Sequence, residues 1–252
     1  MSLADEYARQ AAFRSWDAAF DRLPLRPGDH VLDLGCGVGT PARLLAARGA
    51  RVTAIDADPA LLAAAEPCAD VTYRQADLAT WDEPALGADG LWSSFTAAYF
   101  PDFLPVLRRW THALAPGGWV ALVEVEDLFG HRPLPVVTRG RLKAFVAEAL
   151  AAGRHDFTAG RMLAARVRAA GLDLVQEADL PDEELAAHGA ASAAVLAAWA
   201  ARLDRMRGLQ AYLGADFPAV RAELLAALAD PAHMADARVR FVLARKARAR
   251  SW

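Results

Sequence analysis

The stretch Val31-Leu32-Asp33-Leu34-Gly35-Cys36-Gly37-Val38-Gly39-Thr40-Pro41 decides the fold of this 252-residue chain. Its first four residues are apolar except for Asp33, which indicates a buried parallel strand. Three glycines at alternate positions then form a turn where a ligand can approach bare backbone. Thr40 and Pro41 suit the start of a helix, as an N-cap acceptor and as a first helical residue. Strand, glycine turn and helix together begin a βαβ unit that holds a small ligand.

The spacing of these glycines distinguishes two kinds of ligand. A dinucleotide-binding turn is typically G-x-G-x-x-G, in which the third glycine lets the helix pack closely on the strand. This chain has G-x-G-x-G with an acid two residues before the first glycine. Residues 31–40 therefore resemble the first motif of the class I S-adenosylmethionine (SAM)-dependent methyltransferases, with a type 11/25-like methyltransferase domain. A glycine turn that holds no ligand is the alternative.

The resemblance implies a role for the residues around this turn. In that family the loop passes under the methionine part of SAM, and the acid before it helps to anchor the amino end. SAM carries no pyrophosphate, so the third glycine of the dinucleotide pattern is not needed. The cofactor-binding residues implied here are Asp33, Gly35, Cys36, Gly37 and Gly39.

Two further acids follow predicted strands and point to the nucleoside. Asp56 ends the strand predicted over 51–56, about twenty residues past the first glycine, where a carboxylate accepts both ribose hydroxyls. Asp77 follows the strand predicted over 71–74 and matches the family's adenine-edge residue, although capping is the alternative role. The residues expected at the nucleoside are Asp56, Ala57, Asp77 and Leu78.

The segment before the first strand has apolar side chains at helical spacing over residues 6–23. In many members of the family such a helix lies over the SAM pocket. By this resemblance Tyr7, Gln10 and Arg14 face the ligand, with Arg14 near the carboxylate of SAM. An amphipathic helix that simply packs on the sheet is the alternative.

The predicted fourth strand, residues 89–95, ends beside the transferable methyl group in the family. Some DNA and glutamine methyltransferases carry an Asn-Pro-Pro-Tyr type tetrad there, whereas this chain has Trp92-Ser93-Ser94-Phe95. That departure weighs against methylation of adenine or glutamine amino groups. Ser94 is expected to contribute its backbone to the cofactor site. A Leu-x-Pro-Gly-Gly sequence before the fifth strand, predicted over 119–125, is another feature of the family.

The chain beyond the fifth strand departs from the shared core. Its patterns predict helices over 139–152 and 158–170, a sixth strand over 172–175 and a seventh over 238–244. The resemblance implies that strands six and seven form an antiparallel hairpin, with strand seven inserted between strands five and four. About fifty residues with helical apolar stripes interrupt that hairpin, far more than an ordinary loop.

Together these patterns predict an α/β fold with a doubly wound, seven-stranded, mostly parallel sheet, the Rossmann-like methyltransferase fold with an antiparallel strand seven. A single methyltransferase domain is expected over 1–252, with helical insertions that form a cap. Its parts are expected to be an N-terminal helical segment over the cofactor site, a SAM-binding core and two substrate-cap insertions, at 1–27, 28–126, 127–157 and 181–235. A dimerisation element is the alternative role for the last of these.

The methyl group of SAM is already electrophilic, so the protein does not have to activate it. The chain must mainly orient a nucleophile toward the methyl group and exclude water. A hydroxyl acceptor gains from a base poised near neutral pH. His131 and Glu126, expected at the carboxyl edge of the sheet, are the candidate catalytic residues; Asp127 and His155 are weaker ones. The expected substrate-pocket residues are Tyr99, Phe129 and Trp199.

Composition narrows the classes of function. A net charge of -3 argues against a surface built for nucleic acid. Two cysteines give no disulfide framework, and no signal peptide or membrane-spanning run is visible, so a cytoplasmic protein is expected. A monomer or homodimer is expected, without a metal site. The predicted function is O- or N-methylation of a small-molecule acceptor, with S-adenosylhomocysteine as product and specialised metabolism as one setting. A methyltransferase for protein or RNA, or a non-catalytic SAM-binding protein, is the alternative.

Overall fold

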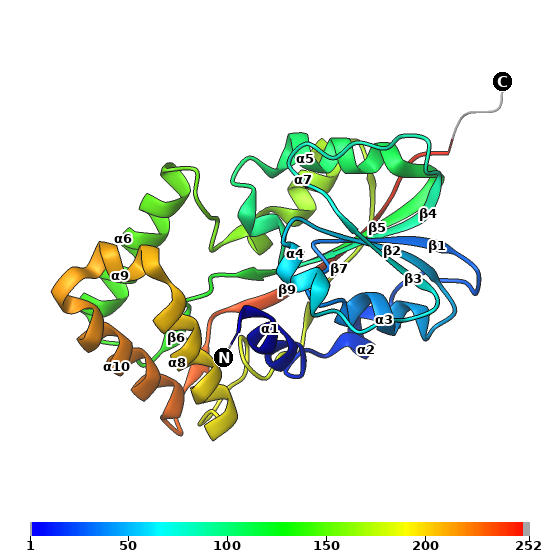
Figure 1. Ribbon diagram of the computed structural model, residues 1–252. Helices are drawn as coiled ribbons and strands as arrows, with labels where there is room; N and C mark the ends of the chain where they lie inside the picture. The colour runs from blue at the N-terminus through cyan, green and yellow to red at the C-terminus, as the bar shows by residue number, and fades with distance from the viewer. Residues whose placement is uncertain (1, 249–252) are drawn as a thin grey trace.

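Seven strands form one sheet in the order β3-β2-β1-β4-β5-β9-β7 (Figure 1). The computed structural model describes residues 2–248. β1 to β5 run parallel to one another, and β9 runs antiparallel to both β5 and β7. The strands of this sheet are β1 (His30–Leu34), β2 (Arg51–Asp56), β3 (Val71–Gln75), β4 (Ala88–Ser94), β5 (Leu114–Glu126), β7 (Asp173–Leu180) and β9 (Arg238–Arg245). The predicted seven-stranded, mostly parallel α/β fold is therefore confirmed.

One detail of the predicted strand order is wrong. β9, the seventh strand of the sheet, lies between β5 and β7 and not between strands five and four. The reason is that β4 already occupies one edge of β5, where Leu91 pairs with Val120. Only the other edge of β5 is left for β9, whose Phe241 pairs with Val123.

Side-chain alternation along the strands gives the sheet two apolar faces. On one face, Val31 belongs to the same buried cluster as Leu45 of α3 (Thr40–Ala46). On the other face, Leu32 belongs to a cluster with Leu107 of α5 (Phe103–Trp110). The remaining core helices and 3-10 turns are α4 (Pro59–Ala63), α7 (Leu163–Ala169), η1 (Ala97–Tyr99), η2 (Thr111–Ala113) and η3 (Ala159–Met162). Helices thus cover both faces, as the doubly wound prediction required.

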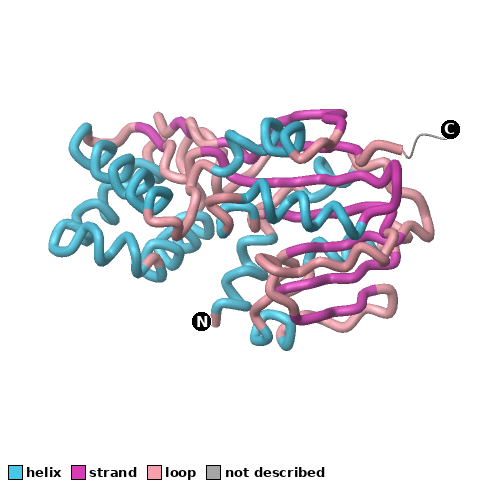
Figure 2. The backbone as a smooth tube through the Cα atoms, turned by 90° about the horizontal axis from the view of Figure 1, so that it is seen from above, coloured by secondary structure: helices cyan, strands magenta, loops and turns pink. Residues whose placement is uncertain are grey.

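A helical cap lies beyond one end of the sheet (Figures 1 and 2). Two insertions far apart in sequence build it, and the short antiparallel pair β6–β8 joins them through His131 and Ala235. Its elements are β6 (His131–Arg132), α6 (Val136–Ala151), α8 (Ala193–Arg205), α9 (Arg207–Leu213), η4 (Gly214–Asp216), α10 (Phe217–Ala229) and β8 (Met234–Ala235). The buried cluster on the α3 face of the sheet continues into these helices.

The N-terminal segment is two helices instead of the single helix expected over 6–23. They are α1 (Leu3–Ala11), which begins with a capping box at Ser2, and α2 (Trp16–Phe20). Between them Arg14 forms a β-bridge with Asp182, which turns the chain out of the helical path. The helix expected over 158–170 is likewise divided into η3 and α7. Within residues 2–248 no helix is both long and apolar enough to cross a membrane.

Candidate functional site

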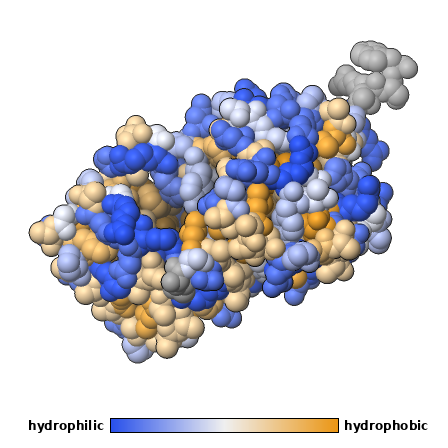
Figure 3. Space-filling view, viewed as in Figure 1, coloured by the Kyte–Doolittle hydropathy of each residue, from blue (hydrophilic) through white to orange (hydrophobic). Residues whose placement is uncertain are grey.

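A cavity of about 840 Å³ lies where the carboxyl ends of the central strands meet the cap. This edge of an open α/β sheet is where such folds bind ligands. The wall of the cavity combines the turn after β1, the ends of β2, β4 and β5, the helix α1, and residues of α6, α8 and α9. In the space-filling view, apolar surface shows at the junction between cap and sheet (Figure 3). One continuous cavity therefore joins the predicted cofactor site to the cap.

The glycine turn borders this cavity with backbone and small side chains. Gly35 has φ 80° and Gly37 has φ 53°, which is the left-handed region that favours glycine. A side chain at Gly35 would collide with that of Thr96, and a Cβ at Gly37 would lie 3.4 Å from the ring of Tyr7. Gly35, Cys36 and Gly37 all line the cavity. The turn therefore presents bare backbone to whatever the cavity holds.

Two residues of the same motif support the turn from behind. Asp33 is fully buried, and neither Asp33 nor Gly39 lines the cavity. Burial and the neighbouring Asp56 raise the pKa of Asp33 to about 8, while the backbone N–H of Ala42 favours its ionised form. Gly39 is the N-cap of α3, and the hydroxyl of Tyr73 fills the space where a side chain at Gly39 would stand. Asp33 and Gly39 thus stand behind the cavity wall, and their roles in cofactor binding stay predictions.

The carboxylate of Asp56 is fixed at the end of β2. Its Oδ2 accepts a hydrogen bond from the backbone N–H of Gly37 at 2.8 Å, and its Oδ1 accepts one from Asp58 at 2.9 Å. Each oxygen retains a further lone pair for another donor. Asp56 and Ala57 both line the cavity, so the carboxylate stands ready for a vicinal diol such as a ribose.

The next acid serves the cavity and a local turn at once. Asp77 and Leu78 both line the cavity, as does Ser94 at the end of β4. The Oδ1 of Asp77 accepts a hydrogen bond from the backbone N–H of Ala79 at 2.9 Å, which is the capping role considered as the alternative. The two roles are compatible, because the carboxylate has a second oxygen.

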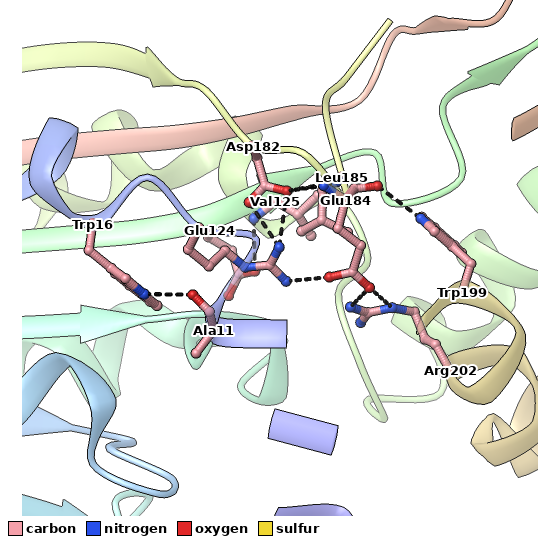
Figure 4. Close-up of polar contacts among 10 residues, drawn as sticks. Ala11, Trp16, Glu124, Val125, Asp182, Glu184, Leu185, Trp199 and Arg202 are labelled. Carbon is pink, nitrogen blue, oxygen red and sulfur yellow. Dashed lines mark hydrogen bonds and ion pairs between the residues drawn. The ribbon is translucent and has the colours of Figure 1, made fainter. Parts of the chain in front are cut away.

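Arg14 borders the cavity but is committed to acids of this chain. Its guanidinium donates to both oxygens of Asp182, at 3.0 and 2.9 Å, and to Glu184 at 2.8 Å. Arg202 of α8 approaches the other oxygen of Glu184 at 2.7 Å (Figure 4). Burial acts to raise the pKa of Glu184, but Arg202 and Arg14 outweigh it and hold that pKa below its ordinary value. The network ties the N-terminal segment to the cap and leaves Arg14 occupied away from a ligand carboxylate.

The cap side of the cavity is mostly apolar and aromatic. Tyr99, a predicted pocket residue, does line it, and its hydroxyl lies 3.2 Å from that of Tyr7. His155 also lines it, with its ring centroid 5.0 Å from that of Tyr99. The apolar residues on this side are Leu128, Phe145, Ala149, Phe157, Leu185, Met206 and Leu209. The sequence patterns did not single these out, because the faces of α6 and α9 that point inward depend on how the two insertions pack together.

Two predicted pocket residues lie one layer behind the cavity wall. Phe129 packs behind Phe157, with ring centroids 5.6 Å apart. Trp199 is fully buried on α8, where its Nε1 donates to the carbonyl of Glu184 at 2.9 Å. Neither residue is in the cavity wall. The expectation that they line the substrate pocket is therefore corrected: both lie behind the residues of the cavity wall.

The candidate bases named from the sequence also lie elsewhere. His131 is buried in the cap, with its Nδ1 3.0 Å from Nε2 of His233, because the β6–β8 pairing draws it away from the cavity. Glu126 forms ion pairs with Arg161 and Arg240 at the rim of the sheet. These positions correct the prediction that His131 and Glu126 face the reacting groups. Asp127 likewise lies outside the cavity wall.

His155 and Glu124 are two of the titratable side chains on the cavity wall near Tyr99. Burial lowers the pKa of His155 to about 4, so this imidazole is neutral and weakly basic. Glu124 is only 1% exposed, and burial raises its pKa to about 7 against the hydrogen bonds from Val125 and Ala98. Glu124 was not among the predicted site residues, although an acid inside the apolar run 119–125 is a visible signal.

Comparison with known proteins adds an independent line of evidence. A family described as "Methyltransferase domain" matches residues 6–177. A trans-aconitate 2-methyltransferase of Paracidovorax citrulli is 40% identical over 107 residues, 40% of this chain and 40% of that protein. A trans-aconitate 2-methyltransferase of Methylobacterium radiotolerans is 33% identical over 165 residues, 63% of this chain and 60% of that protein. The chain therefore spans about half the length of the curated relatives it matches.

Solved structures resemble the whole arrangement of elements. A phosphoethanolamine N-methyltransferase 2 of Haemonchus contortus, in complex with phosphomonomethylethanolamine and S-adenosylhomocysteine, has a TM-score of 0.61. Its sequence is 22% identical, over 92% of this chain and 52% of that chain. At that identity the likeness concerns the fold.

Proposed function

This chain belongs to the methyltransferase-domain family of class I SAM-dependent methyltransferases, and we propose that it methylates a small molecule enclosed in its 840 Å³ cavity. One observation carries the proposal. A single cavity is lined both by the glycine turn with Asp56 and Asp77, and by apolar residues of the cap. Cofactor and acceptor therefore share one cavity between sheet and cap, which suits a small acceptor better than a macromolecule.

The residues at the sheet end of the cavity fit SAM. The carboxylate of Asp56 suits the ribose hydroxyls, and Asp77 with the backbone of Leu78 suits the edge of the adenine. The bare backbone of Gly35 and Gly37 leaves room for the methionine part, because any Cβ there would strain the turn or meet its neighbours. When bound, SAM supplies a methyl group that its sulfonium makes electrophilic.

The remaining task of the chain is to position an acceptor and exclude water. Tyr7 and Tyr99 join α1 to η1 across the cavity through their hydroxyls. The apolar wall from Phe145, Phe157 and Leu209 offers water no hydrogen-bond partners in that part of the cavity. Alignment of two reactants in a water-poor site supplies much of the rate in such displacements.

The acceptor is proposed to be a molecule of low charge that is methylated on oxygen or nitrogen. Trans-aconitate, named for the relatives, is an acid, but the arginines that border this cavity are paired with acids of this chain. The pairs are Arg14 with Asp182 and Glu184, Arg202 with Glu184, Arg205 with Glu6, and Arg154 with Glu148. A polycarboxylate would have to displace these partners.

The test combines binding with product analysis. Calorimetry with S-adenosylhomocysteine is expected to show one site per chain, and incubation with SAM and a panel of small phenols and amines is expected to release S-adenosylhomocysteine. Gly37→Val should abolish both signals, since a branched side chain enters the cavity at a left-handed backbone position. Binding without turnover on any acceptor would favour a non-catalytic protein. Turnover only on added protein or RNA would overturn the proposed acceptor class.

A further inference from the structure

We infer that Glu124 is the catalytic base of this site and that the acceptor is an aromatic hydroxyl compound whose proton Glu124 takes. The inference rests on the proposed function, because it assigns the acceptor half of the same cavity. Glu124 stands near the carboxyl end of β5, the strand next to β4, whose end borders the cavity at Ser94. Its carboxylate is held in a fixed position, the residue lies in the cavity wall, and within the described residues it forms no ion pair with a cationic side chain.

The position of the carboxylate is fixed by backbone donors. Its Oε2 accepts from the N–H of Ala98 at 3.1 Å, and its Oε1 accepts from the N–H of Val125 at 2.9 Å. Ala98 in turn lies in η1 beside Tyr99, and its carbonyl accepts from the N–H of Asp156 at 2.8 Å. Glu124 is therefore held beside the segment that carries Tyr99 and next to the segment that carries His155.

The charged groups around Glu124 neutralise each other and leave it unpaired. Asp156 and Arg166 form an ion pair at 3.2 Å, and Asp156 also accepts from the N–H and hydroxyl of Thr158. Within residues 2–248, Glu124 forms no ion pair with a cationic side chain, whereas the buried Asp182 and Glu184 do. Buried titratable groups with strongly shifted pKa values that lie in a cavity cluster at functional sites.

The energetics suit proton acceptance near neutral pH. Burial raises the pKa of Glu124 to about 7, the range in which a general base works best. His155, on the same side of the cavity, has its pKa lowered to about 4 by burial and is a weaker base. Arg166 acts to lower the pKa of Glu124 and Asp156 to raise it, and both act less than burial does.

The surroundings of Glu124 indicate the kind of acceptor. Aromatic rings of Tyr99, His155, Phe145 and Phe157 line the same side of the cavity and suit a planar ring. A carboxylate acceptor would be repelled, because two like charges cannot both ionise at close range in a buried site. A phenol instead donates a hydrogen bond to Glu124.

The proposed step transfers a methyl group to the acceptor oxygen and a proton to Glu124. The acceptor oxygen forms a bond to the methyl carbon while the carbon–sulfur bond breaks, and the electron pair of that bond stays on sulfur. The hydroxyl proton passes to Oε of Glu124. A cationic sulfonium and an anionic carboxylate are thus converted into a neutral thioether, a neutral ether and a neutral carboxylic acid, which later loses its proton to solvent.

The experiment measures binding of para-nitrophenol to the protein saturated with S-adenosylhomocysteine, by absorbance, at roughly pH 6 and roughly pH 9. The affinity for para-nitrophenol is expected to fall from the lower to the higher pH in the unmodified protein, by a factor about tenfold larger than in Glu124→Gln. The reason is that at high pH both the probe and Glu124 are anionic and repel each other. Glu177→Gln, an exposed glutamate on β7, is the matched control and should behave like the unmodified protein. If the role of Glu124 is purely structural, the affinity for para-nitrophenol should depend on pH in the same way in the unmodified protein and both variants.

Two further measurements keep the outcome decisive. In the unmodified protein para-nitrobenzoate should bind about tenfold more weakly than para-nitrophenol at neutral pH. Equal binding of the two probes, or no binding of para-nitrophenol, would overturn the inference even if Glu124→Gln does not fold. If the unmodified protein does not bind S-adenosylhomocysteine, the proposed function itself is refuted.

Discussion

The backbone N–H of Gly37 donates a hydrogen bond to Oδ2 of Asp56 over 2.8 Å. This contact joins the glycine turn after β1 to the end of β2. The N–H of Asp58 holds the other oxygen at 2.9 Å, so the orientation of the carboxylate is set before a ligand arrives. A site fixed in advance loses less conformational entropy on binding, which favours affinity.

Asp56→Ala should weaken binding of S-adenosylhomocysteine by about 1.5–3 kcal/mol, because hydrogen bonds from the ribose to a charged acceptor are lost. Calorimetry measures the effect directly. Thermal melting provides the control, since Asp56 also holds Gly37 and Asp58. Unchanged affinity in a folded variant would remove Asp56 from the cofactor site.

Asp77→Asn should produce a smaller loss of affinity with little loss of stability. The side-chain oxygen of Asn can still accept from the N–H of Ala79, so the local turn is kept. The second oxygen becomes an amide that donates, which opposes the amino group of adenine. Calorimetry and melting together separate the roles: a lower melting temperature with full affinity would mean that Asp77 is only a cap.

Arg14→Ala should destabilise the protein by about 3–5 kcal/mol, because it leaves Asp182 and Glu184 buried with less compensation. Urea denaturation measures the change. Arg48→Ala, which removes a partly exposed ion pair with Asp17, is the control and should cost about 0–1 kcal/mol. Equal effects of the two substitutions would show that the buried network contributes no more than a surface pair.

The core of the fold follows from local patterns. The predicted second strand, residues 51–56, has the bounds of β2, and the glycine turn lies where its left-handed backbone is needed. Strand β9 was misplaced because the neighbour of an antiparallel strand depends on which sheet edge is free, and no local pattern records that. The break after Ala11 has the same origin, in a bridge between Arg14 and the distant Asp182.

The same difference between local pattern and distant packing separates the site residues that were predicted from those that were not. Gly35, Gly37, Asp56 and Asp77 were found because each ends a strand or belongs to a turn, and these positions reach the cavity by topology alone. Glu124 lies on β5 itself and was overlooked among the apolar residues of that strand. Phe145 of α6 was not predicted, because a wall built from two distant insertions is settled by packing. His131 was misassigned for that reason as well: the pairing of β6 with β8 encloses it against His233.

His131 should make stability depend on pH. Burial and the neighbouring His233 lower the pKa of His131 from 6.5 to about 3, against the opposing effect of Asp236. The unfolded chain therefore binds the extra proton between these values, and the contribution of His131 is present above pH 6.5 and lost as the pH falls below it, by about 1.4 kcal/mol per unit.

Urea denaturation of the unmodified protein and of His131→Gln at several pH values between neutral and mildly acidic tests this. The variant should lose less stability on acidification, because its amide does not titrate. His112→Gln, at an exposed histidine, is the matched control and should keep the steeper dependence. Parallel curves for His131→Gln and the unmodified protein would refute the assignment.

The division of the cavity into a cofactor end and an acceptor end can be tested by filling the second. Ala149 lies on α6, is 2% exposed and lines the cavity among the apolar residues of the cap. Ala149→Phe should remove about tenfold or more of the affinity for para-nitrophenol, because the new ring occupies the space that the probe needs. Binding of S-adenosylhomocysteine should stay unchanged, since Asp56 at the end of β2 and Asp77 just after β3 belong to the cofactor end.

Ala152→Phe makes the same change three residues later, at the exposed C-cap of α6, and should leave both affinities intact. Overpacking at Ala149 is expected to cost about 1–3 kcal/mol, so binding is compared well below the melting temperature of each variant. Loss of both ligands together would mean that the cofactor and the probe share one space. Loss of neither would mean that the cap helix α6 does not enclose the acceptor, and the roof would then have to be formed by α8 and α9 alone.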